Sequence, residues 1–228
     1  MVRTKKKPEY NVENSMKELL QEVTDCYISC ANRKDNTSLR QIADEFDFTH
    51  LKARKLLITA GVYHTDISDE VNRLKEAGKT VPQIMEITGL SRASVHSYLP
   101  YTKTVYNADE LSLNAERIRK YRERQSAVER IEKYFHDPDS SISELVWDAI
   151  VKFDSYPFHT VSGIKFRYTV KGQEIVINRK EEIITRETVD MALSNVLQKD
   201  RVVEEPDQLN ISESGYLYPI LKRLTIIR

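Results

Sequence analysis

Two short stretches of the chain gather basic and hydroxyl side chains that can donate hydrogen bonds to a polyanion. The later stretch contains Ser91, Arg92, Ser94, His96 and Ser97. The earlier one contains Thr49, His50, Lys52, Arg54 and Lys55. Side chains of these types donate to phosphate oxygens and to the acceptor atoms on the edges of base pairs. Their chemistry suits contacts with a polyanion, and Arg40 and Lys103 are additional candidate contacts.

The later donors need a scaffold, and residues 79–99 predict two short helices joined by a tight turn. Gly89 can take the left-handed conformation that the turn requires, and Ser91 can cap the helix that follows. The expected inward positions are Ile84, Thr88, Leu90, Val95, Tyr98 and Leu99. This pattern resembles a helix-turn-helix, most closely the DNA-binding ends of site-specific DNA invertases and resolvases, and more broadly transcription-factor modules. The resemblance implies that the second helix enters a major groove.

One residue departs from that family pattern. Met85 stands where the family usually has Ala at the close helix contact, so the crossing is expected to be slightly wider. The alternative interpretation is an ordinary helical hairpin that binds nothing.

A second copy of the pattern lies 42 residues upstream, in residues 38–57. Ile42, Phe46, Phe48, Ala53 and Leu56 correspond to Ile84, Thr88, Leu90, Val95 and Tyr98. Ala43 supplies the small contact residue, and Asp47 replaces the turn glycine, a position that Asp tolerates better than most residues. A pair of helices that binds nothing remains the alternative here too. Two such modules resemble paired-type and transposase-end DNA-binding regions, whose two second helices would enter neighbouring major grooves.

The whole chain predicts an α+β fold that is mainly α. Its 228 residues have no net charge, 31% charged residues and only 6 Gly and 7 Pro, a composition that favours helices. After about residue 163 the apolar residues alternate, which predicts a strand over 164–170 that turns at Lys171-Gly172-Gln173 and returns over 174–178. A helix capped by Thr185 and a last helix over about 216–224 should follow.

The expected organisation has five parts. They are a basic arm (1–14), two helix-turn-helix units (15–64 and 65–106), a charged connecting helix (107–137) and an α+β domain (138–228). Lys5, Lys6 and Lys7 of the arm either contact phosphates or belong to a solvated tail. The segment from Leu113 to Phe135 is either a dimerisation helix, which would match a palindromic target, or a single helix packed on the last domain.

The C-terminal block offers weaker candidates for a function. A basic ridge of Lys165, Arg167, Arg179, Lys180 and Arg186 is weighed against an ordinary solvated sheet face. His136-Asp137-Pro138-Asp139 is either a metal ligand set or, as we expect, a linker, so no metal or cofactor is predicted. Trp147 is expected in the core.

Several classes of protein are not expected. No apolar run approaches the length of a membrane span, and the first residues lack the apolar region of a signal peptide. Cys26 and Cys30 are four apart, which suits two buried apolar residues better than a redox pair. The Asp/Glu-x-Lys of restriction-type nucleases, the His-x-x-Arg of tyrosine recombinases and a Gly-rich phosphate loop are all absent from the sequence.

The sequence thus predicts a non-enzymatic, sequence-specific DNA-binding protein, a prokaryotic or phage-type transcriptional regulator that is cytoplasmic and nucleoid-associated. The last domain would serve dimerisation, a protein partner or a small effector. Two alternatives stay open: a recombinase or nuclease whose C-terminal active site lacks a recognisable motif, and a defence or counter-defence interaction protein that regulates its own expression.

Overall fold

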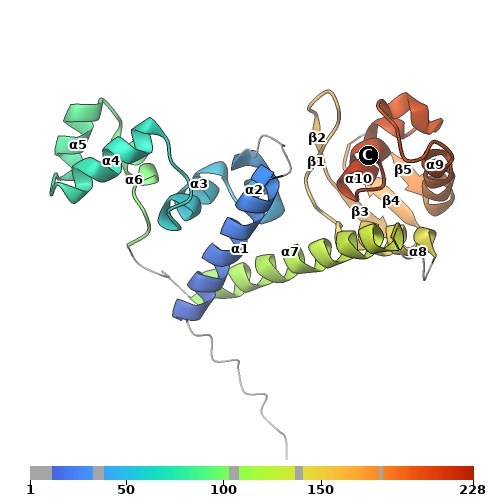
Figure 1. Ribbon diagram of the computed structural model, residues 1–228, viewed down its shortest axis with the longest axis horizontal. Coiled ribbons are helices and arrows are strands. Elements are labelled where there is room, and N and C mark those ends of the chain that lie inside the picture. Colours follow the sequence, from blue (N-terminus) through green and yellow to red (C-terminus); the bar gives the residue numbers. More distant parts are fainter. Residues whose placement is uncertain (1–11, 33–38, 103–107, 137–140, 180–181) are drawn as a thin grey trace, which may run out of the picture. The chain divides into compact units, whose positions relative to one another are not determined.

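A computed structural model describes residues 12–32, 39–102, 108–136, 141–179 and 182–228. The chain divides into two compact units, Met1–Arg119 and Lys120–Arg228. The predicted mainly helical α+β class is confirmed, because helices dominate the described residues and two small antiparallel sheets lie in the C-terminal part (Figure 1). The division between the units falls inside the helix that was expected to connect two domains.

The N-terminal unit contains six helices and the beginning of a seventh among the residues that the structure describes. They are α1 (Val12–Asn32), α2 (Leu39–Glu45), α3 (His50–Thr59), α4 (Asp66–Glu76), α5 (Val81–Thr88), α6 (Arg92–Tyr98) and α7 (Ala108–Tyr134), which continues into the C-terminal unit.

The helices α1, α2 and α3 form what we call the first three-helix bundle, in which α1 packs on both α2 and α3. The predicted inward residues Ile42, Ala53 and Leu56 are almost completely buried. Asp47 ends α2 with a φ of 51°, so the expected replacement of a turn glycine by Asp in the left-handed region is confirmed. The side chain of Thr49 then accepts a hydrogen bond from the backbone N–H of Lys52 and begins α3.

The helices α4, α5 and α6 form the second three-helix bundle around a smaller core. Ile84 and Val95 are fully buried, and Met85 packs against the core from its edge, where the sequence predicted the close helix contact. Gly89 has a φ of 69° and ends α5, as predicted. The two bundles thus repeat the same local plan 42 residues apart, with left-handed turn residues at Asp47 and Gly89.

The N-terminal part of α7 belongs to the first unit and contacts the turn between α2 and α3. The guanidinium of Arg117 lies 5.1 Å from the ring centroid of Phe48, and Nη1 of Arg117 donates to Oδ1 of Asn114. Asn114 and Ile118 are both buried. Among the described residues of this part of the helix, Arg117 and Asn114 therefore contribute contacts that stabilise the first bundle.

The C-terminal unit combines helices with short strands. Its further elements are α8 (Ile142–Lys152), β1 (Phe158–His159), β2 (Lys165–Phe166), β3 (Tyr168–Lys171), β4 (Glu174–Ile177), β5 (Ile183–Thr185), α9 (Arg186–Gln198), the 3-10 helix η1 (Pro206–Leu209) and α10 (Ser214–Arg223). β1 pairs with β2, and β4 lies between β3 and β5 in the three-stranded sheet. The predicted hairpin is confirmed in β3 and β4, which turn at Gly172, and so is the cap of α9 by Thr185.

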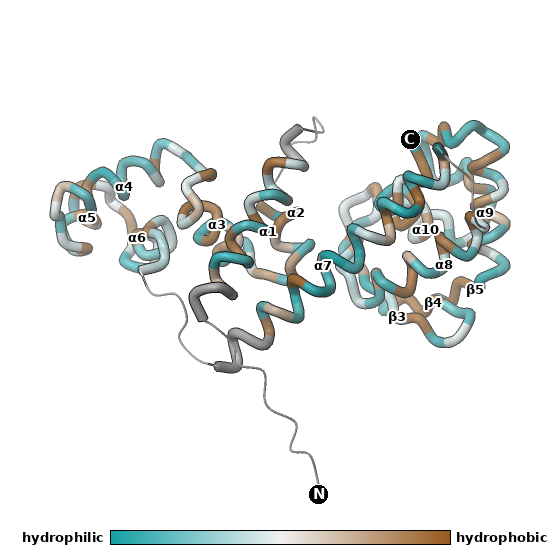
Figure 2. Tube along the Cα trace, turned by 60° about the horizontal axis from the view of Figure 1, so that its bottom comes forward, coloured by the Kyte–Doolittle hydropathy of each residue, from teal (hydrophilic) through white to brown (hydrophobic). Residues whose placement is uncertain are grey.

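The single strand predicted over residues 164–170 is wrong, because the chain changes sheets at Arg167. Phe166 pairs with Phe158 of β1, whereas Tyr168 pairs with Ile177 of β4. The N–H of Arg167 donates to Oδ1 of Asn178, so a side chain replaces the expected ladder partner. Burial alternates along β3 and β4, in keeping with one buried face, and the described part of the unit has both hydrophobic and hydrophilic stretches (Figure 2).

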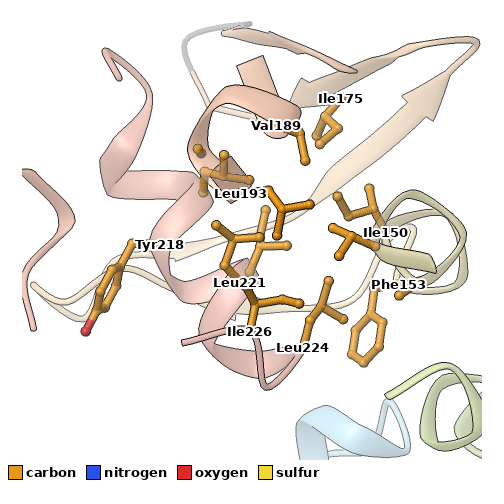
Figure 3. Close-up of a cluster of buried hydrophobic side chains, with 14 of the residues drawn as sticks. Ile150, Phe153, Ile175, Val189, Leu193, Tyr218, Leu221, Leu224 and Ile226 are labelled. Carbon is orange, nitrogen blue, oxygen red and sulfur yellow. The ribbon is translucent and has the colours of Figure 1, made fainter. Parts of the chain in front are cut away.

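The core of the C-terminal unit is one cluster to which every helix and both sheets of that unit contribute. Figure 3 shows Ile150 and Phe153 from the α8 region facing Leu221 and Leu224 from the α10 region. The hydroxyl of Tyr168 donates to the carbonyl oxygen of Ile150 inside this core, and complete burial raises the pKa of that hydroxyl well above its ordinary value. Trp147 is buried in the same cluster, as the sequence predicted.

Candidate nucleic-acid interface

The helix α6 begins with a hydroxyl cap that uses two of the candidate donors. Oγ of Ser91 accepts a hydrogen bond from the backbone N–H of Ser94, and the two serine hydroxyls lie 2.9 Å apart. Ser97 also bonds within the helix, because its hydroxyl donates to the carbonyl oxygen of Ser94. These serines first stabilise α6 itself.

One face of α6 remains exposed. Arg92, Ala93 and His96 are all exposed, whereas Val95 of the same helix is fully buried. At 3.6 residues per turn, the three exposed residues lie within an arc of about 100°. This arc, which we call the α6 face, carries a guanidinium, an imidazole and a methyl group.

The other predicted DNA-reading helix, α3, contacts α6 through Arg54. Nη2 of Arg54 donates to Oγ of Ser97 over 2.5 Å, and its guanidinium lies 4.1 Å from the ring centroid of Tyr98. Arg54 is half-buried as a result. The structure therefore places this arginine against α6, not on a free face of α3.

Lys55 makes a second contact between the same helices. Its Nζ donates to the carbonyl oxygen of His96 over 3.1 Å and lies 4.7 Å from the ring centroid of Tyr101. Partial burial lowers the pKa of this amine from its ordinary value. A lysine near the last carbonyls of a helix is favourable, because those carbonyls lack partners within the helix.

The remaining candidates on the first bundle include one that contacts other side chains and two that are exposed to solvent. Nζ of Lys52 donates to Oδ1 of Asn114 and lies 4.8 Å from the ring centroid of Phe48. His50 on α3 and Arg40 on α2 are exposed. Only the beginning of α3 is therefore open to solvent, together with the neighbouring Leu51, which is 60% exposed.

The contact between α3 and α6 brings the two predicted DNA-reading helices close together. From Arg54 to the start of α3 the helix rises about 6 Å, and from Ser97 to the start of α6 about 8 Å. With packed helix axes about 10 Å apart, the helix starts would be separated by less than about 25 Å. Neighbouring major grooves on one side of DNA are about 34–36 Å apart, so this separation does not favour the predicted entry of both helices.

No protein-family model, curated protein or solved structure matches this chain. No helix in the part of the chain that the structure describes is long and apolar enough to cross a membrane.

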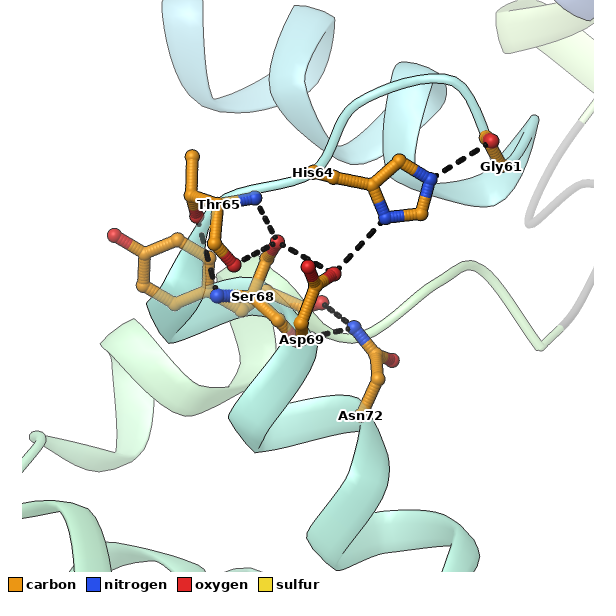
Figure 4. Close-up of polar contacts among 7 residues, drawn as sticks. Gly61, His64, Thr65, Ser68, Asp69 and Asn72 are labelled. Carbon is orange, nitrogen blue, oxygen red and sulfur yellow. Dashed lines mark hydrogen bonds and ion pairs between the residues drawn. The ribbon is translucent and has the colours of Figure 1, made fainter.

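A polar cluster joins the two bundles at the start of α4 (Figure 4). Nδ1 of His64 lies 2.9 Å from Oδ1 of Asp69, and Nε2 lies 3.1 Å from the carbonyl oxygen of Gly61. Both neighbours are acceptors, and only the protonated imidazole can donate to both. The bond to Asp69, followed by the bond to Gly61, accordingly raises the pKa of His64 above its ordinary value.

We expect the imidazole of His64 to titrate at a higher pH in the wild type than in an Asp69→Asn variant. Because folding raises the pKa of His64, its contribution to stability is present below the ordinary pKa and is lost as the pH rises through the raised one. Imidazole resonances followed by NMR over about pH 5–8 measure the midpoint. Asp66→Asn, which changes another exposed carboxylate in the first turn of α4, is the matched control and should leave the midpoint nearly unchanged. Equal midpoints in the wild type and D69N would contradict the role of Asp69.

Two members of the basic ridge considered for the C-terminal unit make contacts within that unit. Nη1 of Arg167 donates to the carbonyl oxygen of Ser155, whereas Arg186 bonds to Glu144 and lies over the ring of Trp147. These two guanidiniums stabilise separate parts of the C-terminal unit. Lys180 lies outside the described residues.

Other sequence candidates also lie wholly or partly outside the described residues. They are the arm with Lys5, Lys6 and Lys7, Lys103, the side chain of Cys30, and residues 137–139. Cys26 is buried, as predicted. Among the residues that are described, no three His, Cys, Asp or Glu side chains are grouped as metal ligands would be.

Sequence reasoning missed Tyr98 and Tyr101 as partners of the basic residues of α3. Tyr98 had been assigned to the core of its own bundle, where it is only partly buried. The one available signal in the sequence was the spacing of these two tyrosines, which lie three residues apart at the end of the second predicted helix-turn-helix. That spacing does not specify which cation the rings contact.

Proposed function

We propose that this protein binds double-stranded DNA sequence-specifically and inserts α6 into the major groove. The observation that carries the proposal is the α6 face, on which Arg92, Ala93 and His96 are exposed while Val95 of the same helix packs into the core of the second bundle. A B-form major groove is about 12 Å wide and admits one α-helix. The proposal places the second bundle in the helix-turn-helix class that its sequence resembles.

Each residue of the α6 face has a chemical role in this proposal. The guanidinium of Arg92 can donate two parallel hydrogen bonds to O6 and N7 of a guanine, which is the commonest specific contact of this kind. The imidazole of His96 can donate to a second base or to a phosphate. Ala93 allows close approach and can contact the methyl group of a thymine.

The charge around the α6 face predicts how strongly DNA affinity should depend on salt concentration. Acidic and basic residues nearly balance over residues 65–102, so the second bundle has no general attraction for a polyanion. Affinity would then come from a few phosphate contacts, with His50 and Arg40 of the first bundle as candidates. Each contact adds about 0.9 to the slope of log K against log salt, so the slope should be shallow.

The proposal includes a regulatory role. The C-terminal unit has its own hydrophobic core and lies on the same chain as the proposed DNA-binding unit. This organisation suits a transcriptional regulator whose second unit mediates dimerisation, contact with a protein partner or response to an effector. In this role the protein binds the duplex without cutting it.

Selection from a library of random duplexes with the full chain tests the proposal. We expect enrichment of one short motif, bound at least about a thousandfold more tightly than a scrambled duplex. The purified complex should leave the duplex uncut when Mg²⁺ is added. Failure to enrich any motif would refute sequence-specific binding, and cleavage at the bound site would favour the DNA-processing alternative.

A further inference from the structure

The two bundles of the N-terminal unit are joined by side chains of α3 that hold the end of α6. Arg54 contacts Ser97 and Tyr98, and Lys55 contacts the carbonyl oxygen of His96. All three contacted residues lie in the last turn of α6. The first bundle therefore constrains α6 from outside the bundle to which α6 belongs.

We infer that Arg54 is a positioning residue that fixes the orientation of α6, so that only α6 reads bases and α3 acts as its support. The inference rests on the proposed DNA-binding function and adds a division of roles that the repeated sequence pattern does not contain. In that pattern Arg54 and Arg92 are both candidate base readers. In the structure Arg92 is exposed, whereas the guanidinium of Arg54 is engaged with α6.

The chemistry of the contact requires an arginine. A planar guanidinium can stack on an aromatic ring while its N–H groups donate in the plane of the group. Arg54 does both, because it lies over the ring of Tyr98 and donates to Oγ of Ser97. Lysine at this position would keep the positive charge but would lose the planar stack.

The orientation of α6 matters because base readout depends on where its side chains begin. Ser97 accepts from Arg54 and donates to the carbonyl oxygen of Ser94, so the contact continues into the backbone of α6. A rotation of this short helix would move the guanidinium of Arg92 relative to the bases. Phosphate contacts tolerate such a movement better than bidentate base contacts do, since a point charge has little directional preference.

The test compares Arg54→Lys with Arg54→Ala, using the full chain with the selected duplex and a scrambled one. We expect Arg54→Lys to lower the ratio of specific to random affinity by about tenfold, while random-DNA affinity stays within about twofold of the wild type. Arg54→Ala should lower the ratio equally. The matched control is Lys17→Ala, which removes an exposed cation of α1 in the first bundle and should leave both the ratio and the random-DNA affinity nearly unchanged.

Two further measurements keep the outcomes distinct. Ser97→Ala removes the acceptor from the α6 side and should lower the ratio as Arg54→Lys does, which covers the case in which a variant at Arg54 fails to fold. Backbone amide NMR shifts of the last turn of α6 should change in Arg54→Lys even without DNA. A wild-type ratio in both Arg54→Lys and Ser97→Ala would overturn the inference. If the wild type selects no duplex, the proposed function fails, and unchanged α6 shifts in Arg54→Lys would independently refute the positioning contact.

Discussion

Replacement of Arg92 by alanine is expected to weaken binding to the selected duplex by about 1–3 kcal/mol, which is about fivefold to more than a hundredfold in affinity. Arg92 is exposed on the α6 face and can form a bidentate pair with one guanine. Its loss should relax base preference at one position of the site. Dissociation constants at a fixed salt concentration, measured for the selected duplex and for variants at each position, check this result.

The fold of the second bundle should survive that change, because the Arg92 side chain makes no contribution to the core around Ile84 and Val95. Arg73→Ala is the matched control. Arg73 is an exposed arginine of α4 in the same bundle, and its Nη2 pairs with Oε1 of Glu70 over 2.7 Å. It should lose less than about twofold in specific affinity, since exposed ion pairs contribute little. Equal losses on specific and random DNA in Arg92→Ala would contradict base readout.

Replacement of Ile150 by alanine should destabilise the C-terminal unit by about 2–5 kcal/mol. Ile150 is fully buried between α8 and the rest of the core, so its truncation removes apolar contacts and leaves a cavity. Trp147 is the only tryptophan of the chain and lies in this core, so its fluorescence reports on this unit. Urea denaturation followed by tryptophan fluorescence measures the change in the free energy of unfolding.

The neighbouring residue provides a control on the same helix. Val151 is 44% exposed, and Val151→Ala should change the free energy of unfolding by less than about 0.5 kcal/mol. The proposed DNA-binding residues all lie in the N-terminal unit. In Ile150→Ala we therefore expect DNA affinity to persist at urea concentrations that have already unfolded the C-terminal core. A wild-type midpoint in Ile150→Ala would show that Ile150 is not part of a tightly packed core.

Local features of the fold followed from the sequence because they depend on neighbouring residues. The left-handed turns at Asp47 and Gly89, the cap by Ser91 and the burial of Ile84 and Val95 were all predicted from spacing and residue type. Backbone sterics, hydrogen bonding over three residues and helical periodicity determine such features within a few turns of chain.

Features that depend on distant partners were not predictable in the same way. The strand expected over 164–170 is divided because Phe166 and Tyr168 pair with different strands, and α8, β1 and β5 had no distinct prediction. Strands of two or three residues have too few side chains to show an alternation. Their existence depends on partners elsewhere in the C-terminal unit.

The candidate site shows the same difference. The sequence alone determined that two similar helix pairs occur 42 residues apart and that each ends in a helix with polar donors. The contacts of Arg54 and Lys55 with α6, and the exposure of Arg92 and His96, became apparent only from the packing of the two bundles. The physical reason is that arginine, lysine and tyrosine side chains have both an apolar stem or ring and a polar end, so they suit a solvated face and an interface equally well. The packing of one bundle against the other determines whether each of these side chains lies in the interface or in solvent.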